Sequence, residues 1–205
     1  MRTFIFLLGL GLIVSGCKTT PATSNIPQNY VFKKNGRSII IGKVKFENIE
    51  GDFKEGALAF VNEQTDKVYP IKLGLPTRQT PAFNGKVLAE YYYFIELPAG
   101  QYSIGEVAAT HGKFSPFEIH LLNANLTIGQ NSIVYVGTIR VHGVGKSLEH
   151  IGPITEDEII NEQNDVIKAF KSEYPQFQDT KVSVKVIDRY KWFRDDHIET
   201  DFEKY

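Results

Sequence analysis

Short runs in which apolar residues recur at every second position constrain the fold of this chain more than any other feature. In the stretch IIGKVKFEN two sets of residues alternate: Ile40, Gly42, Val44 and Phe46 on one side, Ile41, Lys43, Lys45 and Glu47 on the other. Successive side chains of a β-strand point to opposite faces, so this alternation predicts a strand with one buried face.

Similar runs predict further strands along the chain, at residues 56–61, 67–73, 87–97, 102–109, 117–122, 126–128, 133–141 and 182–187. Pro70 cannot donate a backbone hydrogen bond, which places its strand at a sheet edge or at a bulge. Gly105 predicts a bulge in the strand that contains it. Strands separated by turn residues at this spacing predict a β-sandwich or a barrel.

One helix is predicted near the C-terminus, at about residues 156–174. Thr155-Glu156-Asp157-Glu158 has the pattern of a capping box, and Pro175 would end the helix. An apolar stripe follows at helical spacing, formed by Ile159, Val166, Ile167, Phe170 and Tyr174. We expect this amphipathic helix to pack on the sandwich.

The N-terminal end has the design of a secretory signal. Met1 and Arg2 make a positively charged start, an apolar run follows at residues 4–14, and Ser15 and Gly16 are small residues suited to a cleavage site. A membrane-spanning helix needs about 20 apolar residues, so the shorter run favours a cleaved signal.

Cys17, the only cysteine of the chain, follows this segment directly. Val14-Ser15-Gly16-Cys17 resembles the lipobox of bacterial lipoproteins, which has a branched aliphatic residue, two small residues and a cysteine. The resemblance implies that residues 1–16 are removed, that the Cys17 thiol carries diacylglycerol, and that the new amino group receives a fatty acid such as palmitate. Because Lys18 rather than aspartate follows, enterobacterial sorting rules imply an outer-membrane protein that faces the periplasm. A plain signal peptide with a chance cysteine is the alternative.

The rest of the chain divides into three parts. Residues 17–36 hold the cysteine and a stretch rich in Thr, Pro, Ser and Asn, which predicts a flexible tether to the bilayer. Residues 37–188 contain the predicted strands and helix and form one domain. The polar tail at 189–205 carries aromatic residues, among them Trp192 and Phe193.

The stretch FIELPAGQYSIGEV, from Phe94 to Val107, predicts a hairpin whose turn is Pro98-Ala99-Gly100. It resembles the LPxGxY turn of transthyretin-like (prealbumin-like) and carboxypeptidase-regulatory-like sandwiches, and the layout is similar to that of uncharacterised bacterial lipoproteins with such a domain. The resemblance implies an all-β fold, an antiparallel sandwich with one C-terminal amphipathic helix. It implies little about function, because such sandwiches serve many roles.

Metal and phosphate sites have no local signature in the sequence. The five histidines fall in no metal-ligand spacing: His111, His120, His142, His150 and His197. Asp195-Asp196-His197 is more simply a solvated group on the tail. The stretch GVGKS at 143–147 lacks the first glycine of a phosphate-binding loop, where Arg140 stands, so a turn is expected there. No metal or cofactor is predicted.

No catalytic residue is predicted either. The chain has no G-x-S-x-G elbow, and lipidation would consume the only thiol. Glu90, Glu96 and Glu106 could form a carboxylate pair across neighbouring strands, although acidic residues on strands usually face solvent.

Four consecutive aromatic residues, Tyr91-Tyr92-Tyr93-Phe94, place rings on both faces of one strand. One set fills the core, and the other, Tyr92 and Phe94, is either covered by the helix or displayed. If it is displayed, these two rings are the first candidate surface for a partner, and Trp192 and Phe193 are the second.

Charge and motifs together predict a non-enzymatic role. The formal net charge is -1 and the chain has no basic block, so nucleic acid is not an expected partner. We expect a lipid-anchored protein of the cell envelope that binds a protein or a glycan. The alternatives are an envelope hydrolase with a site built from distant residues and a lipoprotein subunit of a secretion or surface-assembly complex.

Overall fold

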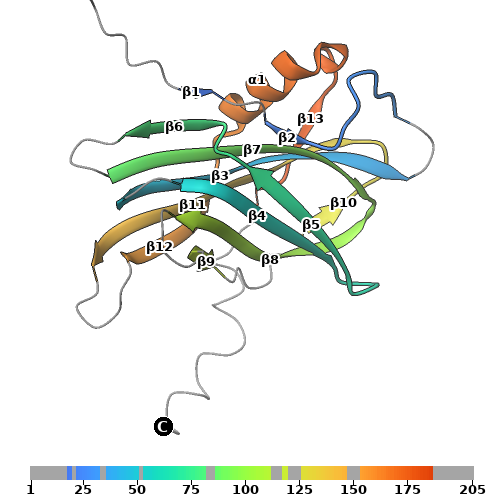
Figure 1. The fold of residues 1–205 in the computed structure, drawn as a ribbon. Helices are drawn as coiled ribbons and strands as arrows, with labels where there is room; N and C mark the ends of the chain where they lie inside the picture. The colour runs from blue at the N-terminus through green and yellow to red at the C-terminus, as the bar shows by residue number, and fades with distance from the viewer. Residues whose placement is uncertain are drawn as a thin grey trace, which may run out of the picture.

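A computed structural model describes residues 18–19, 22–32, 36–50, 53–81, 86–111, 117–119, 126–146 and 153–186. These residues form two β-sheets packed together, with one α-helix on the outer face of the larger sheet (Figure 1). Within these ranges, no helix combines the length and the apolar character that crossing a membrane would require.

The larger sheet, sheet A, has the strand order β1-β6-β7-β3-β11-β12, with β13 paired to β11 and β2 paired to β7. Its strands are β1 (Lys18–Thr19), β2 (Thr23–Ser24), β3 (Arg37–Glu50), β6 (Arg78–Pro81), β7 (Lys86–Pro98), β11 (Ile133–Lys146), β12 (Pro153–Ile160) and β13 (Val182–Val184).

The smaller sheet, sheet B, has the order β10-β8-β4-β5, with β9 paired to β8. Its strands are β4 (Phe53–Asn62), β5 (Lys67–Gly74), β8 (Gly100–His111), β9 (Phe117–Ile119) and β10 (Leu126–Ile128). Each strand predicted from the sequence overlaps a strand of one of the two sheets, and the last is shorter than predicted. Residues 120–122, at the end of one predicted strand, lie outside the described residues.

The main core fills the space between the sheets and follows the predicted alternation. From β3 it takes Ile40, Val44 and Phe46, and every second residue of β7 joins it, including Tyr91 and Tyr93. Gly42 pairs with Tyr93 across β3 and β7, and a Cβ atom at this glycine would overlap the Tyr93 hydroxyl group. The glycine therefore makes room for a fully buried ring.

Sheet A is mixed, which corrects the expectation of an antiparallel sandwich. β3 pairs with β11 in parallel at the centre of the sheet, and the pairs β11–β13 and β2–β7 are also parallel. Parallel neighbours need a long connection, and here all strands of sheet B lie between β3 and β11 in the sequence. Alternation predicts which face of a strand is buried but does not predict its partner or direction.

The stretch LPAGQY forms a corner between the sheets and not a hairpin. β7 belongs to sheet A and β8 to sheet B, so the turn at Pro98-Ala99-Gly100 carries the chain from one layer to the other. The Tyr102 hydroxyl group donates a hydrogen bond of 2.9 Å to the Pro98 carbonyl oxygen, which closes the corner. Two predictions on sheet B are confirmed: the register shifts at Gly105, and Pro70 lies on the edge strand β5.

The helix α1 (Gln163–Glu173) begins later than predicted. Thr155–Glu158, expected to cap it, lies in β12, because β12 pairs with the preceding strand β11 from Thr138 to Lys146. The same pairing corrects the turn expected at Gly143, since residues 143–146 continue β11. The end of the helix is as predicted: Pro175 starts a short 3-10 helix, η2 (Pro175–Phe177).

Residues 22–32 pack against the domain, which corrects the expectation of a free tether over this range. Ile26 and Tyr30 are buried between the helical region and sheet A. The Tyr174 hydroxyl group donates to the Ser24 hydroxyl group at 2.6 Å, and the Tyr30 hydroxyl group donates to a Glu96 carboxylate oxygen at 2.7 Å. The segment is polar in composition, but its few apolar side chains suffice to hold it in place.

Candidate functional site

The outer face of sheet A, on the side of α1, has an apolar half and a charged half. In the apolar half, α1, η2 and residues 22–32 cover the sheet. The buried side chains there are Ile26, Tyr30, Ile39, Ile41, Tyr92, Phe94, Ile133, Tyr135, Val166, Phe170, Tyr174 and Phe177. In the other half, charged side chains from five neighbouring strands make ion pairs across the sheet, and we call them the charged row: Arg78, Glu90, Lys43, Lys45, Glu47, Arg140 and Glu158.

The first candidate partner surface is covered. Tyr92 and Phe94 are buried, and Phe94 packs edge-on against Phe170 and Tyr174 of the helical region. Cover by the helix was one of the two alternatives drawn from the sequence, and it is the one found. The two rings present no exposed surface to a partner, because the apolar side of α1 needs the same area of sheet.

Lys43 is the centre of the charged row. Its side chain is only 1% exposed, and its Nζ atom lies 3.0 Å from Glu90, 2.7 Å from Glu162 and 2.8 Å from Asp165. The ammonium group also lies 5.1 Å from the centre of the Tyr92 ring. Glu90 comes from β7, whereas Glu162 and Asp165 lie at the start of α1. One buried amine therefore ties the helix to the sheet.

The electrostatics keep Lys43, Glu162 and Asp165 charged. Burial alone would lower the pKa of Lys43, but hydrogen bonds to Asp165, Glu162 and Glu90 raise it above its ordinary value. Burial alone would raise the pKa values of Glu162 and Asp165, but their bonds to Lys43 lower both. Tyr92 also donates a hydrogen bond to Asp165, and burial together with this bond raises the pKa of its hydroxyl group.

The row continues on both sides of Lys43. Arg78 on β6 lies 3.5 Å from Glu90, and Lys45 lies 3.4 Å from Glu162 and 3.1 Å from Glu47. Further along, Arg140 on β11 joins Glu47 to Glu158 on β12. Positive and negative side chains alternate across the sheet, so this face has little net charge to attract an ionic ligand.

The chemistry of the row is structural. A protonated amine is not a nucleophile, and the carboxylates around Lys43 accept hydrogen bonds from its ammonium group and do not stand free as bases. Within the described ranges, no group of three or more His, Cys, Asp and Glu side chains is arranged to hold a metal ion.

The carboxylates proposed from the sequence as a pair have separate partners. Glu90 binds Lys43 and Arg78, whereas Glu96 binds Tyr30 and lies 3.2 Å from Arg37. Glu106 is on β8, in the other sheet, so the structure does not bring it to the neighbouring strand of β7 as expected.

Several sequence-predicted residues lie outside the described residues. These are the lipidation residue Cys17, the second candidate surface Trp192 and Phe193, and the tail group Asp195-Asp196-His197. Of the five histidines, His142 is placed with its side chain, and its Nδ1 atom lies 3.3 Å from Glu47. His142 thus belongs to the end of the charged row.

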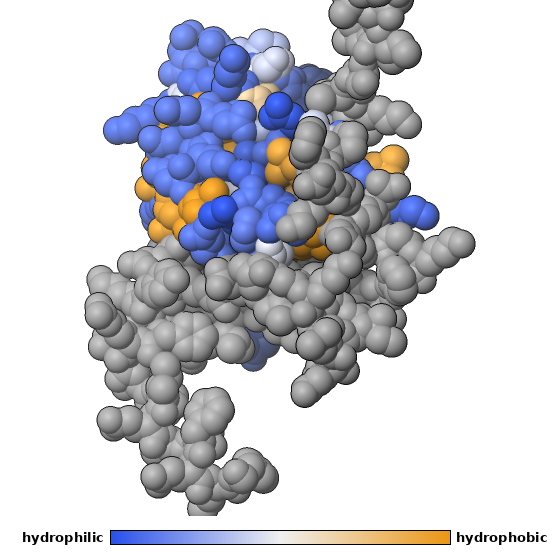
Figure 2. Space-filling view, turned by 90° about the vertical axis from the view of Figure 1, so that its left-hand side faces the viewer, coloured by the Kyte–Doolittle hydropathy of each residue, from blue (hydrophilic) through white to orange (hydrophobic). Residues whose placement is uncertain are grey.

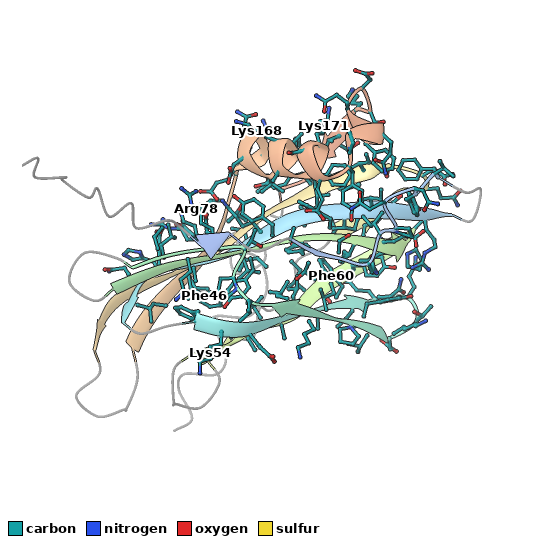
Figure 3. All side chains as sticks on the ribbon, turned by 45° about the horizontal axis from the view of Figure 1, so that its top comes forward. Phe46, Lys54, Phe60, Arg78, Lys168 and Lys171 are labelled. Carbon is teal, nitrogen blue, oxygen red and sulfur yellow. The ribbon has the colours of Figure 1, made fainter. Side chains whose placement is uncertain are left out.

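A groove lies on the side of α1 that faces away from the sheet. Its volume is about 410 Å³, and its lining is polar except for one side chain: Asn164, Ile167, Lys168, Lys171, Ser172 and Gln178. Lys168 and Lys171 project from the helix there (Figure 3). The Lys171 amine donates to the Gln178 carbonyl oxygen at 2.6 Å, so one of the two amines is already engaged.

Comparison with known proteins finds no matching family model and no matching curated protein. The chain is therefore described by its architecture: a mainly β protein with two packed sheets and one helix near the C-terminus.

Sequence reasoning missed the buried role of Lys43. On a half-buried strand its position belongs to the face that also carries Lys45 and Glu47, for which solvent exposure is the default. One signal was available: Ile41 shares that face, and an isoleucine there indicates that something covers the strand nearby. Glu162 and Asp165 could not be found while the helix was expected to start at 156.

Proposed function

We propose that this protein is a lipid-anchored component of the cell envelope whose β domain binds a protein or glycan partner without catalysing a reaction. The observation that carries the proposal is the sequence Val14-Ser15-Gly16-Cys17, directly after a short apolar run with a positive start. Two acyl chains or more on one cysteine give stable membrane anchoring, whereas one chain gives marginal binding.

The charged row supports a non-enzymatic role. Its most buried groups, Lys43 and Glu90, bind each other, and Glu162 and Asp165 bind the same amine. These ion pairs stabilise the contact between α1 and sheet A, and the charged groups that form them are bound to one another. The described part of the face in Figure 2 is mostly hydrophilic, with hydrophobic residues in separate areas, as suits a face that is in contact with water.

For the fold, the proposal is a transthyretin-like sandwich. The support is the LPAGQY corner, in which the proline ends β7 and the tyrosine hydroxyl group binds the Pro98 carbonyl oxygen. An experimental structure of this domain would test the proposal, and strands β7 and β8 paired with each other in one sheet would contradict it.

For the location, we propose the outer membrane with the domain facing the periplasm, because Lys18 follows the cysteine. Changing Lys18→Asp is expected to move the lipidated protein to the inner-membrane fraction of a Gram-negative host. A density gradient that separates the two membranes measures the shift, and an unchanged distribution would contradict the proposed location.

The lipid anchor is tested by Cys17→Ser. We expect loss of labelling by radioactive palmitate and loss of the protein from the membrane fraction. Ser15→Ala is the matched control, because alanine keeps a small residue in the motif and should leave labelling intact. Continued labelling of the Cys17→Ser variant would refute the proposal.

The binding role is tested by isolating the wild-type protein from detergent-solubilised membranes and from a peptidoglycan digest. Stoichiometric recovery of one protein would favour the subunit alternative, and retention on a glycan column would favour a solitary glycan binder. Hydrolysis of an envelope substrate by the purified domain would contradict the non-enzymatic role.

A further inference from the structure

We propose that the β1–β6 edge of sheet A, together with Leu75, rests on the bilayer, so that the domain sits directly on the membrane surface. The inference depends on the proposed lipidation of Cys17, and it adds the orientation of the domain. The occupant of this surface is a phospholipid bilayer, and two independent attachments of the N-terminal segment support it.

The first attachment is β1. Lys18 and Thr19 pair with Gln79 and Arg78 of β6, so sheet structure begins at the residue after Cys17. Each residue spans at most about 3.6 Å, so the Cys17 sulfur must lie within roughly 10 Å of the β6 edge. A diacylglycerol on that sulfur is held in the bilayer, which brings this edge of the sheet to the head groups.

The second attachment is at Thr23. Its hydroxyl group donates a hydrogen bond of 2.5 Å to the Leu73 carbonyl oxygen, and Thr23 and Ser24 pair with β7 at Tyr93 and Phe94. Thr23 is six positions after Cys17, which limits the distance between them to about 22 Å even in an extended chain. The end of β5 is therefore held close to the anchor as well, without reference to β1.

The side chains at this place suit a membrane surface. Leu75, two residues after Leu73, is 58% exposed, although leucine is usually buried. Arg78 follows on β6; one of its guanidinium nitrogens lies 3.5 Å from Glu90, but the side chain is half-exposed, and a guanidinium group has further donors that bind phosphate oxygens well. An aliphatic side chain for the acyl region and a cation for the phosphates lie three residues apart.

Figures 1 and 3 show the same geometry. β1 lies beside β6 near the top of Figure 1, where β5 also ends, and Figure 3 labels Arg78 at this edge. The start of β5 lies at the opposite end of the strand, at the β4–β5 turn. The proposal therefore predicts that one end of β5 touches the bilayer and that the other end does not.

Two variants of the full-length, lipidated protein test this orientation: Leu75→Cys and Val68→Cys. Val68 is the matched control because it is also an exposed aliphatic residue of the β5 region, 52% exposed, but lies near the start of the strand. Lipidation converts the Cys17 thiol to a thioether, so a maleimide fluorophore reacts only with the introduced cysteine.

The labelled proteins are placed in vesicles of phosphatidylethanolamine and phosphatidylglycerol that contain nitroxide-labelled lipid. We expect several-fold stronger quenching, and a blue-shifted emission, for the label at position 75 than for the label at 68. Both sites are exposed in the fold, so neither change should unfold the domain, and circular dichroism checks this.

The two possible failures are distinguishable. If mass spectrometry shows an unlipidated Cys17, the proposed function is wrong and the membrane contact is wrong with it. If the protein is lipidated and floats with the vesicles but both labels are quenched equally, or neither is quenched, the anchor stands and the docked orientation is overturned.

Discussion

A lysine that the alternation of β3 assigns to the polar face becomes the most deeply buried charge of this site. Lys43 is 1% exposed because the start of α1 lies over it and supplies two of its three carboxylates. Burying Lys43 and Glu90 costs desolvation, and the ion pairs that these two make with each other and with the more exposed Glu162 and Asp165 offset that cost only while the partners are present. Lys43 therefore stabilises the fold only as long as its carboxylate partners are in place.

Changing Lys43→Met is expected to destabilise the domain by about 3–5 kcal/mol, because it leaves carboxylates facing an apolar side chain. Lys72→Met is the matched control: Lys72 also pairs with a carboxylate, Glu55, but is 72% exposed, and its change should cost at most about 0.5 kcal/mol. Urea denaturation of both variants measures the difference. Equal losses would show that Lys43 is no more than a surface ion pair.

At the scale of elements, the positions of the strands were predictable from the sequence. The start of α1 and the path of the chain at the Pro98 corner were not. Strands can be predicted from the alternation of apolar and polar residues, because this pattern is contained within each strand's own sequence, as in β3 and β7. The start of α1 was misplaced because a capping box is a local pattern, whereas the fate of Thr155–Glu158 is decided by pairing with β11. The corner at Pro98 was predicted as a turn, but a turn does not specify whether the chain returns to the same sheet.

The segment at 22–32 is the second such case. Its composition is that of a linker, yet the side chains of Ile26 and Tyr30 pack between α1, η2 and sheet A. The sequence does not reveal that these elements lie together. The candidate surface at Tyr92 and Phe94 failed as an exposed patch for the same reason, since the structure supplies a cover from residues that are distant in sequence.

Changing Ile26→Ala is expected to lower the free energy of unfolding by about 2–4 kcal/mol, because it opens a cavity among the buried side chains between α1 and sheet A. Val31→Ala is the control in the same segment: Val31 is 66% exposed, so its change should stay within about 0.5 kcal/mol. Thermal unfolding measures both. If Ile26→Ala behaved like Val31→Ala, residues 22–32 would be a tether after all.

At the scale of the whole molecule, stability should depend on pH through the charged row. The pKa of Glu47 is lowered in the fold, as are those of Glu162 and Asp165: burial opposes ionisation of each carboxyl group, but bonds to Lys45, Arg140 and Lys43 outweigh it. A group whose folded pKa lies below its unfolded value contributes stability above the unfolded pKa, which is about 4 for carboxyl groups. That contribution is lost as the pH falls through the folded pKa.

We therefore expect the urea midpoint to be constant near neutral pH and to fall steadily below about pH 4.5. Asp165→Asn removes one of these carboxyl groups, so the fall should be shallower in this variant, although its stability at pH 7 is lower. Urea titrations of both proteins between neutral and acid pH compare the slopes. Parallel curves would show that Asp165 does not take part in the pH dependence.

The parallel contact of β3 with β11 also imposes an order of events on a newly made chain. Ile39 leaves the ribosome early, but its neighbour Ile133 is not made until all of sheet B has emerged. Until then β3, at the centre of sheet A, has an unsatisfied edge, which is a template for wrong pairing with other nascent chains. A chaperone that shields this edge during biogenesis would act on β3 before sheet A is complete.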